Sequence, residues 1–416
     1  MLLAAAVVVP LWRQQGTRSW RTIFPEDGAT YATQALAHGP LAVILRGYNG
    51  YLQLPARLVA LPVPFVPFRQ LSVYFAVAST CVVALLAWFV FWATDELVDS
   101  TLLRLLLAGL VVLAPSMGFE NTANVTNTIW VFLAVAPVAL VSLREGTWGV
   151  VLRGVVAFVA ATATPVVVVT VPLGVAWALY RRSRAALVVL GTMLAGLALQ
   201  ALVVLSTTNP TDPHSRGGDL VQYWDWLALR VAGNTVAGPK WLSTAWASHG
   251  RLVQVGVVVA LCAVFALAAP GAGRRAHLLA AAFACTAIAE FLLPLWGRGV
   301  TTVVLVDNAG IPPFDMRFSV APCFLLACAL AFLLGSPERR GASTRVRVLV
   351  GLVVAQTLVL VVVNFRTATF TSSRAPWDRQ VADTYERSCR GAPPEKVAVV
   401  VEGFFPVVAT CGDLAP

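Results

Sequence analysis

The segment LSVYFAVASTCVVALLAWFVFWA, residues 71–93, contains no charged side chain from end to end. A helix that crosses the hydrocarbon core of a bilayer needs about 20 mostly apolar residues, so this stretch is long enough to span. The whole chain is 58% hydrophobic and only 12% charged, with a mean hydropathy of +0.77. Soluble domains carry roughly 25% charged residues. The sequence therefore predicts an all-α polytopic membrane protein in contact with a lipid bilayer.

Ten further apolar segments resemble this one. They are residues 2–12, 102–115, 129–143, 148–163, 167–180, 185–206, 253–270, 276–296, 318–335 and 347–365. The first is shorter than a span normally requires. Together the segments predict about 11 transmembrane helices in one domain, residues 1–365.

The arginines predict the orientation, because short cytoplasmic loops retain positive charge. With the N-terminus inside, the cytoplasmic connections contain Arg144, Arg153, Arg181, Arg182, Arg184, Arg274, Arg275, Arg339, Arg340, Arg345 and Arg347. Only the loop with Asp95, Glu96 and Asp99 argues against this, and acidic residues count little. The basic residues lie in separate loops, so the net charge of +10 does not predict nucleic acid binding. Abundant Ala, Val, Leu and Arg, with two lysines, is typical of a high-GC bacterium, which predicts a bacterial cytoplasmic membrane protein.

An odd number of spans places residues 366–416 outside the cell as a small C-terminal segment. Its two cysteines, Cys389 and Cys411, are the only ones outside the apolar runs. In an oxidising compartment they are expected to form a disulfide. Two free thiols are the alternative.

The same topology places two long polar loops outside. In residues 13–70, the stretch YNGYLQLPARLVALPVPFVPF (48–68) mixes apolar residues with Pro and Arg and predicts short interfacial helices. Residues 207–252 are rich in aromatic side chains. Trp224 and Trp226 could stack on sugar rings, or could hold an interfacial helix at the membrane surface.

The stretch FPEDGATYATQAL, residues 24–36, places Glu26 and Asp27 side by side just after the first apolar run. A carboxylate at the membrane surface can act as a general base toward a hydroxyl group, and its neighbour can orient the acceptor or raise the pKa. Alternatively, Asp27 caps the helix that follows. Both interpretations can hold together. A divalent metal ion bound by the pair is also possible, although no cofactor is expected.

The stretch FENTANVTNTIW, residues 119–130, places Glu120, Asn124 and Asn127 on one helical face, with Asn121 nearby. Amides suit hydroxyl-rich ligands because they both donate and accept hydrogen bonds. These residues are candidates for binding a sugar or an acceptor. The alternative is a polar loop bound to its own backbone.

The last candidate site residues are two arginines and one acid inside a predicted span. Arg317 and Arg57 lie where guanidinium groups could bind phosphate, or could extend to the interface or pair with an acid. Glu290 lies inside a predicted span, where an ionisable residue usually has a function, as in a proton-coupled transporter. The four histidines are scattered, so no imidazole metal site is expected.

Several of these stretches together resemble the GT-C class of membrane glycosyltransferases, in particular uncharacterised bacterial members. The stretches are FPEDGATY, GYNGYLQLPARL, ENTANVTNTIW, TATP at 162–165, DMRFSVAP and PWDRQV, and they are spread over most of the chain. The resemblance implies an inverting enzyme that passes a sugar from a polyprenyl-phosphate donor to a glycan, lipid or protein acceptor outside the membrane.

The resemblance also implies roles for single residues. Asp27 or Glu26 would be the base, with Asp27 favoured. Arg317 and Arg57 would hold the donor phosphate, and Glu120, Asn124 and Asn127 would line the sugar pocket. Many relatives carry the acidic pair in the order Asp-Glu rather than Glu-Asp, so both acids remain candidates. The main alternative is a transporter or flippase for an amphiphilic substrate that uses Glu290. An acyl- or phosphotransferase and a purely structural protein are further alternatives.

Overall fold

The computed structural model describes residues 2–117, 123–207, 220–298, 317–339, 344–369, 371–390, 397–399 and 406–415. In these residues, 6 helical segments are long and apolar enough to cross a membrane. They are Phe68–Ala93, Arg184–Ser206, Arg251–Ala268, Arg274–Gly297, Arg317–Leu334 and Thr344–Val363. The protein is therefore a multi-pass α-helical membrane protein, as its composition predicts.

All eleven apolar segments of the sequence are helical, with ends that differ from the predicted ones by at most a few residues. They are α1 (Leu2–Leu11), α4 (Leu71–Ala93), α5 (Thr101–Leu113), α6 (Thr128–Val141), α7 (Thr147–Ala163), η5 with α8 (Pro165–Thr170 and Val171–Arg181), α9 (Arg184–Ser206), α13 (Arg251–Ala268), α14 (Arg274–Arg298), η7 with α16 (Arg317–Ser319 and Val320–Leu334) and α17 (Thr344–Val363). The apolar runs thus predict where the helices lie.

Helix α6 is the centre of the bundle, and every one of its residues is buried. It packs against α4, α7, α8, α9 and α16. A helix that is apolar on all sides can be surrounded by other helices or by lipid. The sequence TIWVFLAVAPVALV has no charged side chain, and this permits its central position.

The predicted outer loop 207–252 also contains helices in its described part. These are α10 (Leu220–Leu227), the π-helix η6 (Ala228–Gly233), α11 (Asn234–Val236) and α12 (Gly238–His249). Lys240 joins α12 to the end of α17, because its ammonium group donates to the carbonyls of Val363 (2.8 Å) and Arg366 (3.0 Å).

Segment 13–70 contains the short helices predicted for it. These are η1 (Ser19–Arg21), the π-helix η2 (Asp27–Ala32), α2 (Thr33–His38), α3 (Leu54–Ala60), η3 (Val63–Phe65) and η4 (Phe68–Gln70). Prolines and glycines between them keep each helix short.

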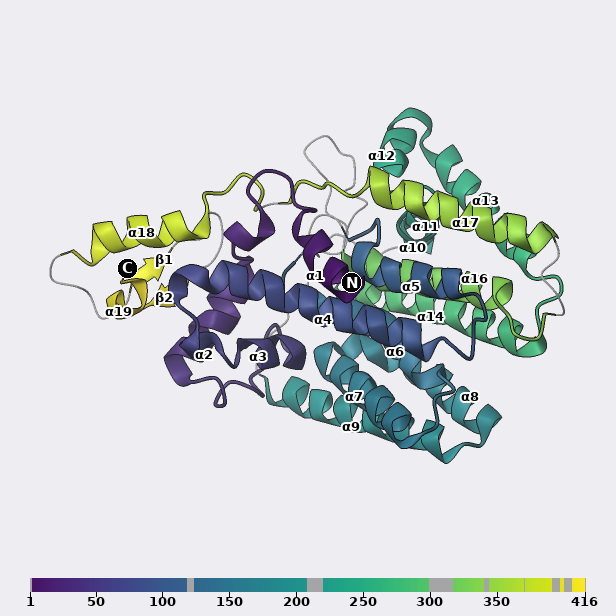
Figure 1. Ribbon diagram of the computed structural model, residues 1–416, viewed down its shortest axis with the longest axis horizontal. Coiled ribbons are helices and arrows are strands. Elements are labelled where there is room, and N and C mark those ends of the chain that lie inside the picture. The colour runs from purple at the N-terminus through teal and green to yellow at the C-terminus, as the bar shows by residue number, and fades with distance from the viewer. Residues whose placement is uncertain are drawn as a thin grey trace.

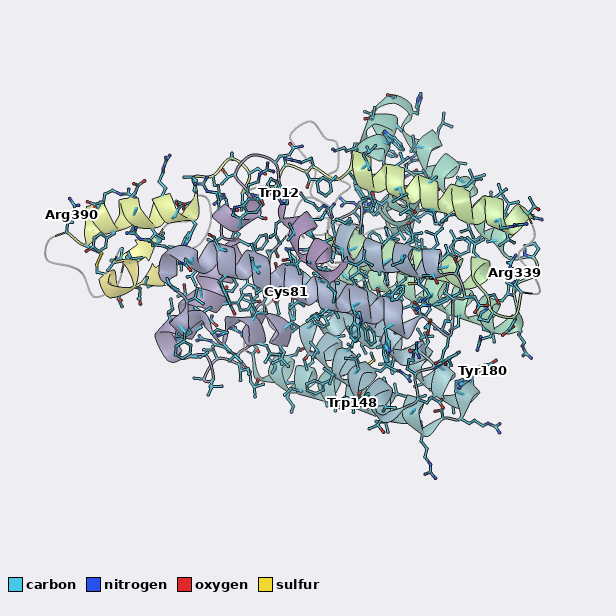
Figure 2. All side chains as sticks on the ribbon, in the orientation of Figure 1. Trp12, Cys81, Trp148, Tyr180, Arg339 and Arg390 are labelled. Atoms are coloured by element: carbon cyan, nitrogen blue, oxygen red, sulfur yellow. A yellow bond between two sulfur atoms is a disulfide. The ribbon has the colours of Figure 1, made fainter. Side chains whose placement is uncertain are left out.

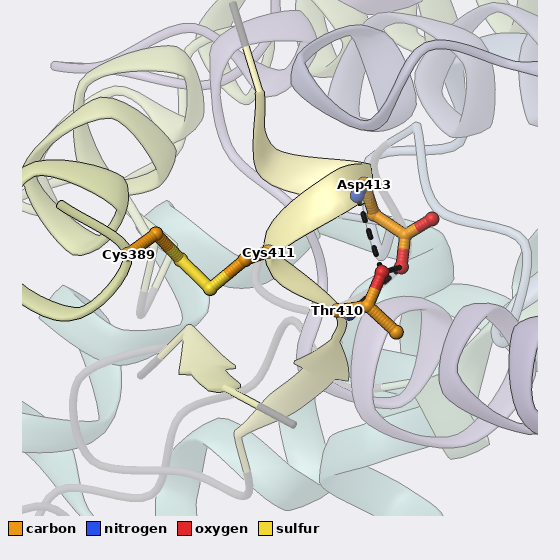
Figure 3. Close-up of a disulfide and its surroundings, with 4 residues drawn as sticks. All are labelled: Cys389, Thr410, Cys411 and Asp413. Atoms are coloured by element: carbon orange, nitrogen blue, oxygen red, sulfur yellow. Dashed lines mark hydrogen bonds between the residues drawn. A yellow bond between two sulfur atoms is a disulfide. The ribbon is translucent and has the colours of Figure 1, made fainter. Parts of the chain in front are cut away.

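A C-terminal unit packs on this segment. It consists of α18 (Trp377–Ser388), the antiparallel strands β1 (Val397–Val399) and β2 (Val407–Ala409), and α19 (Cys411–Leu414). The two strands are an addition to the predicted all-α fold. The disulfide predicted for Cys389 and Cys411 is present and joins α18 to α19 (Figure 3). We call segment 13–70 and the C-terminal unit the head.

The head has a core of its own. Trp377 of α18 is fully buried, and its indole N–H donates to the carbonyl of Phe68 at 2.9 Å. The C-terminal unit lies beside α2, η2 and η4 at one end of the molecule, while α13, α14, α16 and α17 lie toward the other end (Figure 1). Chain ends far apart in sequence thus form one structural unit.

Ion pairs cluster at the helix connections that the arginine pattern predicts to be cytoplasmic. Asp95 pairs with Arg104 and Arg144, Glu145 with Arg181 at 3.3 Å, and Glu338 with Arg275 at 3.5 Å. The acidic loop that opposed the predicted topology therefore has arginine partners. Figure 2 shows Arg339 and Tyr180 toward this end of the molecule and Arg390 of the C-terminal unit at the opposite end.

Candidate functional site in the head

The acidic pair lies at the start of the π-helix η2. Glu26 is half-buried and directly precedes the helix, while Asp27 is its first residue and only 1% exposed. A π-helix has one more residue per hydrogen-bonded turn than an α-helix, and such turns occur often at functional sites. Here the two neighbouring carboxyl groups have different surroundings.

Asp27 binds the beginning of the central helix α6. One carboxylate oxygen accepts the amide of Val125 at 2.9 Å, and the other accepts the amide (2.9 Å) and hydroxyl (2.6 Å) of Thr126. These amides belong to the turn that leads into α6, where helix N–H groups lack partners of their own. Asp27 is therefore a cap, but for α6 rather than for the helix that follows it in sequence.

Two opposing effects act on the Asp27 carboxyl group. Burial raises its pKa to about 7, against the lowering effect of the hydrogen bonds from Thr126 and Val125, and the nearby charge of Glu26 raises it further. The carboxyl group therefore changes its charge near neutral pH. The Asp27 oxygens already accept three hydrogen bonds. Glu26 is only half-buried and therefore has more access to solvent than Asp27.

The other end of α6 is capped by a residue of opposite charge. The Arg153 side chain is buried and donates to the carbonyls of Ala139 (2.9 Å), Leu140 (3.1 Å) and Arg144 (3.0 Å). An acid at the N-terminus and a cation at the C-terminus both complement the helix dipole. The central helix is thus capped by long-range contacts at both ends.

Asn124 also contributes to the start of α6. Its side-chain oxygen accepts the amide of Asn127 at 2.9 Å, which is the backbone-bound arrangement expected for a polar loop. Both asparagines line a small cavity of about 20 Å³ together with Arg13 and Thr80, which is room for about one water molecule. Their sugar-binding role stays a prediction, and Glu120 and Asn121 lie outside the described residues.

Arg57 of α3 is another charged group buried in the head. Its side chain is 1% exposed, and its guanidinium group lies over the ring of Tyr31 at 5.0 Å. One nitrogen donates to the side-chain oxygen of Gln34 at 2.7 Å. Within the described part of the chain, Nε and the second terminal nitrogen have no hydrogen-bond partner. No described carboxylate forms a salt bridge with this guanidinium group.

Polar side chains connect Arg57 with the acidic pair. The Tyr31 hydroxyl donates to Gln53, and the Gln53 amide donates to the Tyr51 hydroxyl at 2.9 Å. Burial raises the pKa of Tyr31 well above its usual value, and the charges of Arg57 and Asp27 both act on it. Tyr31 therefore contacts the cation and is close enough to the acid to respond to its charge.

Tyr48 is also close enough to the acidic pair to respond to its charge. Burial raises the pKa of Tyr48 to about 12, and the charge of Glu26 contributes to this rise. Sequence analysis did not single out the tyrosines or Gln53. The available signal was the motif GYNGYLQLPARL, which places hydroxyl and amide groups in an otherwise apolar segment.

The C-terminal unit holds η2 from the other side. The amide of Val408 in β2 donates to the Thr33 hydroxyl at 3.1 Å, which in turn donates to the Gly28 carbonyl at 3.1 Å. A methyl group on Gly28 would lie 2.6 Å from Val407, so this close approach requires glycine. The position of Asp27 thus depends on contacts with β2.

The remaining predicted site residues are more scattered. The Arg317 guanidinium group lies over the ring of Phe318 at 5.3 Å, and Phe318 packs edge-on against Trp130 in the first turn of α6 at 4.8 Å. Phe318, the neighbour of Arg317, therefore packs against the start of α6, which Asp27 also contacts. Trp224 is 53% exposed, while Trp226 packs beneath the buried guanidinium group of Arg230 at 5.3 Å.

Both tryptophans lie on α10, which packs against η6 and α14 rather than within the head. Glu290 is buried in α14. In the part of the chain that the structure describes, no group of three or more His, Cys, Asp or Glu side chains could hold a metal ion. A divalent ion at Glu26 and Asp27 would need ligands beyond these two carboxylates. Each carboxylate oxygen of Asp27 already accepts a backbone amide.

The chain matches no family model, no curated protein and no solved structure.

Proposed function

We propose that this protein is a GT-C-like inverting membrane glycosyltransferase that moves a sugar from a polyprenyl phosphate to an acceptor hydroxyl. In this proposal about 11 helices span the membrane, the N-terminus is inside and the head lies outside. The ion pairs at the opposite end and the disulfide in the head both support that orientation.

The observation that carries the proposal is the buried guanidinium group of Arg57 in one cluster with the acidic pair. An unpaired buried charge costs several kcal/mol, so the site is stabilised by an anion that pairs with it. Two adjacent guanidinium nitrogens match two phosphate oxygens. The donor phosphate would therefore bind Arg57, with Arg317 as a second cation.

The acid–base chemistry is assigned to Glu26. Its carboxylate takes the proton from the acceptor hydroxyl, whose oxygen attacks the anomeric carbon of the sugar. The bond from that carbon to the phosphate oxygen breaks, and the electron pair leaves with the phosphate. Asp27 holds η2 against α6 and so positions Glu26. Because arginine neutralises the leaving phosphate, the reaction needs no metal ion.

The test is transfer of radiolabel from a panel of polyprenyl-phosphate sugars by purified protein in bilayers. Glu26→Gln should lower kcat by about 10²- to 10⁴-fold, the usual contribution of a general base, without changing stability. Arg57→Lys should weaken donor binding, because an ammonium group cannot make the bidentate contact.

The matched control is Glu96→Gln. Glu96 is a half-exposed carboxylate at the opposite end that pairs with Arg144 at 3.7 Å, so its activity should equal that of wild type. Full activity of Glu26→Gln would exclude Glu26 as the base. Absence of transfer from every donor would instead favour the transporter, for which buried Glu290 is the specific observation.

A further inference from the structure

A second buried carboxyl group lies outside the head, in α14. The Glu290 side chain is 1% exposed. At a rise of 1.5 Å per residue, it lies about 24 Å along the helix from Arg274 and about 12 Å from Arg298. Because the hydrocarbon core is about 30 Å thick, Glu290 lies within the apolar part of the span.

The surroundings of this carboxyl group are apolar. Phe283, Ala287, Phe291 and Leu295 on the same helix are all fully buried. Thr286, one turn earlier, donates its hydroxyl to its own helix, at the Ala282 carbonyl (2.8 Å). Within the described part of the chain, neither carboxyl oxygen of Glu290 has a hydrogen-bond partner.

The backbone at this position also lacks a donor. The helix continues through Pro294, four residues later. Proline has no amide hydrogen, so the Glu290 carbonyl loses its usual helical partner. The side chain of Glu290 thus lacks a hydrogen-bond partner among the described residues, and its backbone carbonyl lacks the usual helical donor.

No described cation compensates a negative charge here. The elements that pack against α14 are α10, α16, η5 and η7. Their titratable or charged side chains are Tyr223 and Asp225 on α10, Cys323 and Cys328 on α16, and Arg317 in η7, while η5 has none. None of these groups hydrogen bonds to Glu290. The side chain of Arg298 lies outside the described residues.

An ionised carboxylate without partners in an apolar interior is far less stable than the neutral acid. We propose that Glu290 is a proton-binding site inside the membrane, which holds its proton at neutral and mildly alkaline pH. The ligand is a proton rather than a metal cation, because among the described residues no group of three or more His, Cys, Asp or Glu side chains could hold a metal ion. This inference does not depend on the proposed glycosyl transfer.

The experiment is infrared spectroscopy of the whole protein in bilayers, prepared with and without glutamate carrying ¹³C in its side-chain carboxyl group. At pH 8 the exposed glutamates are ionised, so a label-sensitive carbonyl band of a protonated acid reports a buried glutamic acid. Since the label enters glutamate only, Asp27 does not contribute. We expect one such band in wild type and none in Glu290→Gln.

Further measurements test the proposal without relying on Glu290→Gln alone. Glu26→Gln should leave the band unchanged, because that group is half-buried in the head. Absence of a protonated glutamate band in labelled wild-type protein at pH 8 would overturn the proposal. So would its replacement by ionised-carboxylate bands on addition of sodium ions at constant pH, because the site would then bind an alkali cation.

Discussion

Asp27 and Glu290 are two carboxyl groups with the same 1% exposure and opposite surroundings. Asp27 accepts three hydrogen bonds from the start of α6, whereas Glu290 accepts none from described residues. Burial disfavours the charge of both. Donors allow Asp27 to ionise near neutral pH, while Glu290 has nothing to stabilise the anion. Burial alone therefore does not indicate the role of an acid.

The largest expected effect on stability comes from replacing Asp27, the acid that accepts hydrogen bonds. Asp27→Ala leaves two buried amides and a hydroxyl without an acceptor. Each unsatisfied group costs about 1–3 kcal/mol, so unfolding should become about 3–9 kcal/mol easier. Denaturant unfolding in detergent micelles measures this. Glu26→Gln is the control and should stay close to wild type. Equal stability of Asp27→Ala and wild type would show that the cap contributes nothing.

The pH dependence of stability sharpens the comparison next. The pKa of Asp27 is raised from 3.8 to about 7 in the folded state. The unfolded chain therefore releases its proton first, and this contribution to stability is complete below pH 4 and is lost as pH rises to 7. The loss is about 4 kcal/mol at most. Unfolding at several pH values should show this slope in wild type and a smaller one in Asp27→Asn.

Disturbing the contact between η2 and the C-terminal unit should have a smaller effect on stability. Gly28→Ala places a methyl group 2.6 Å from Val407 and should destabilise by about 1–3 kcal/mol, a typical cost of overpacking. Gly146→Ala is the control, because nothing lies within 4 Å of its added methyl group. Adding Val407→Ala to Gly28→Ala should restore part of the melting temperature. No recovery would mean that the clash lies elsewhere.

The smallest expected effect has the opposite sign. Glu290→Met replaces a buried polar group that lacks partners with an apolar one of similar length, so stability should rise by about 1 kcal/mol. Thermal unfolding of Glu290→Met and Asp27→Ala, measured side by side, tests the comparison between the two acids. A loss of several kcal/mol in Glu290→Met would show that Glu290 has a partner that holds it in the fold.

The apolar runs determined the helices, because a bilayer accepts only segments of that length and composition with their backbone groups paired internally. The apolar sequence of α6 permits its complete burial, and the disulfide follows from two cysteines alone in a polar tail. The acidic pair and Arg57 were also recognisable as candidates, because charged groups are rare in so apolar a chain.

Only the tertiary structure decided what these groups contact. Asp27 caps a helix that begins about a hundred residues later, and a local pattern can reveal only caps within a few residues. The contact of Arg57 with Tyr31 and the hydrogen bond from Val408 to Thr33 likewise join separate segments. Spacing along a helix or strand predicts which residues share a face. Packing between elements decides which acid receives donors and which must keep its proton.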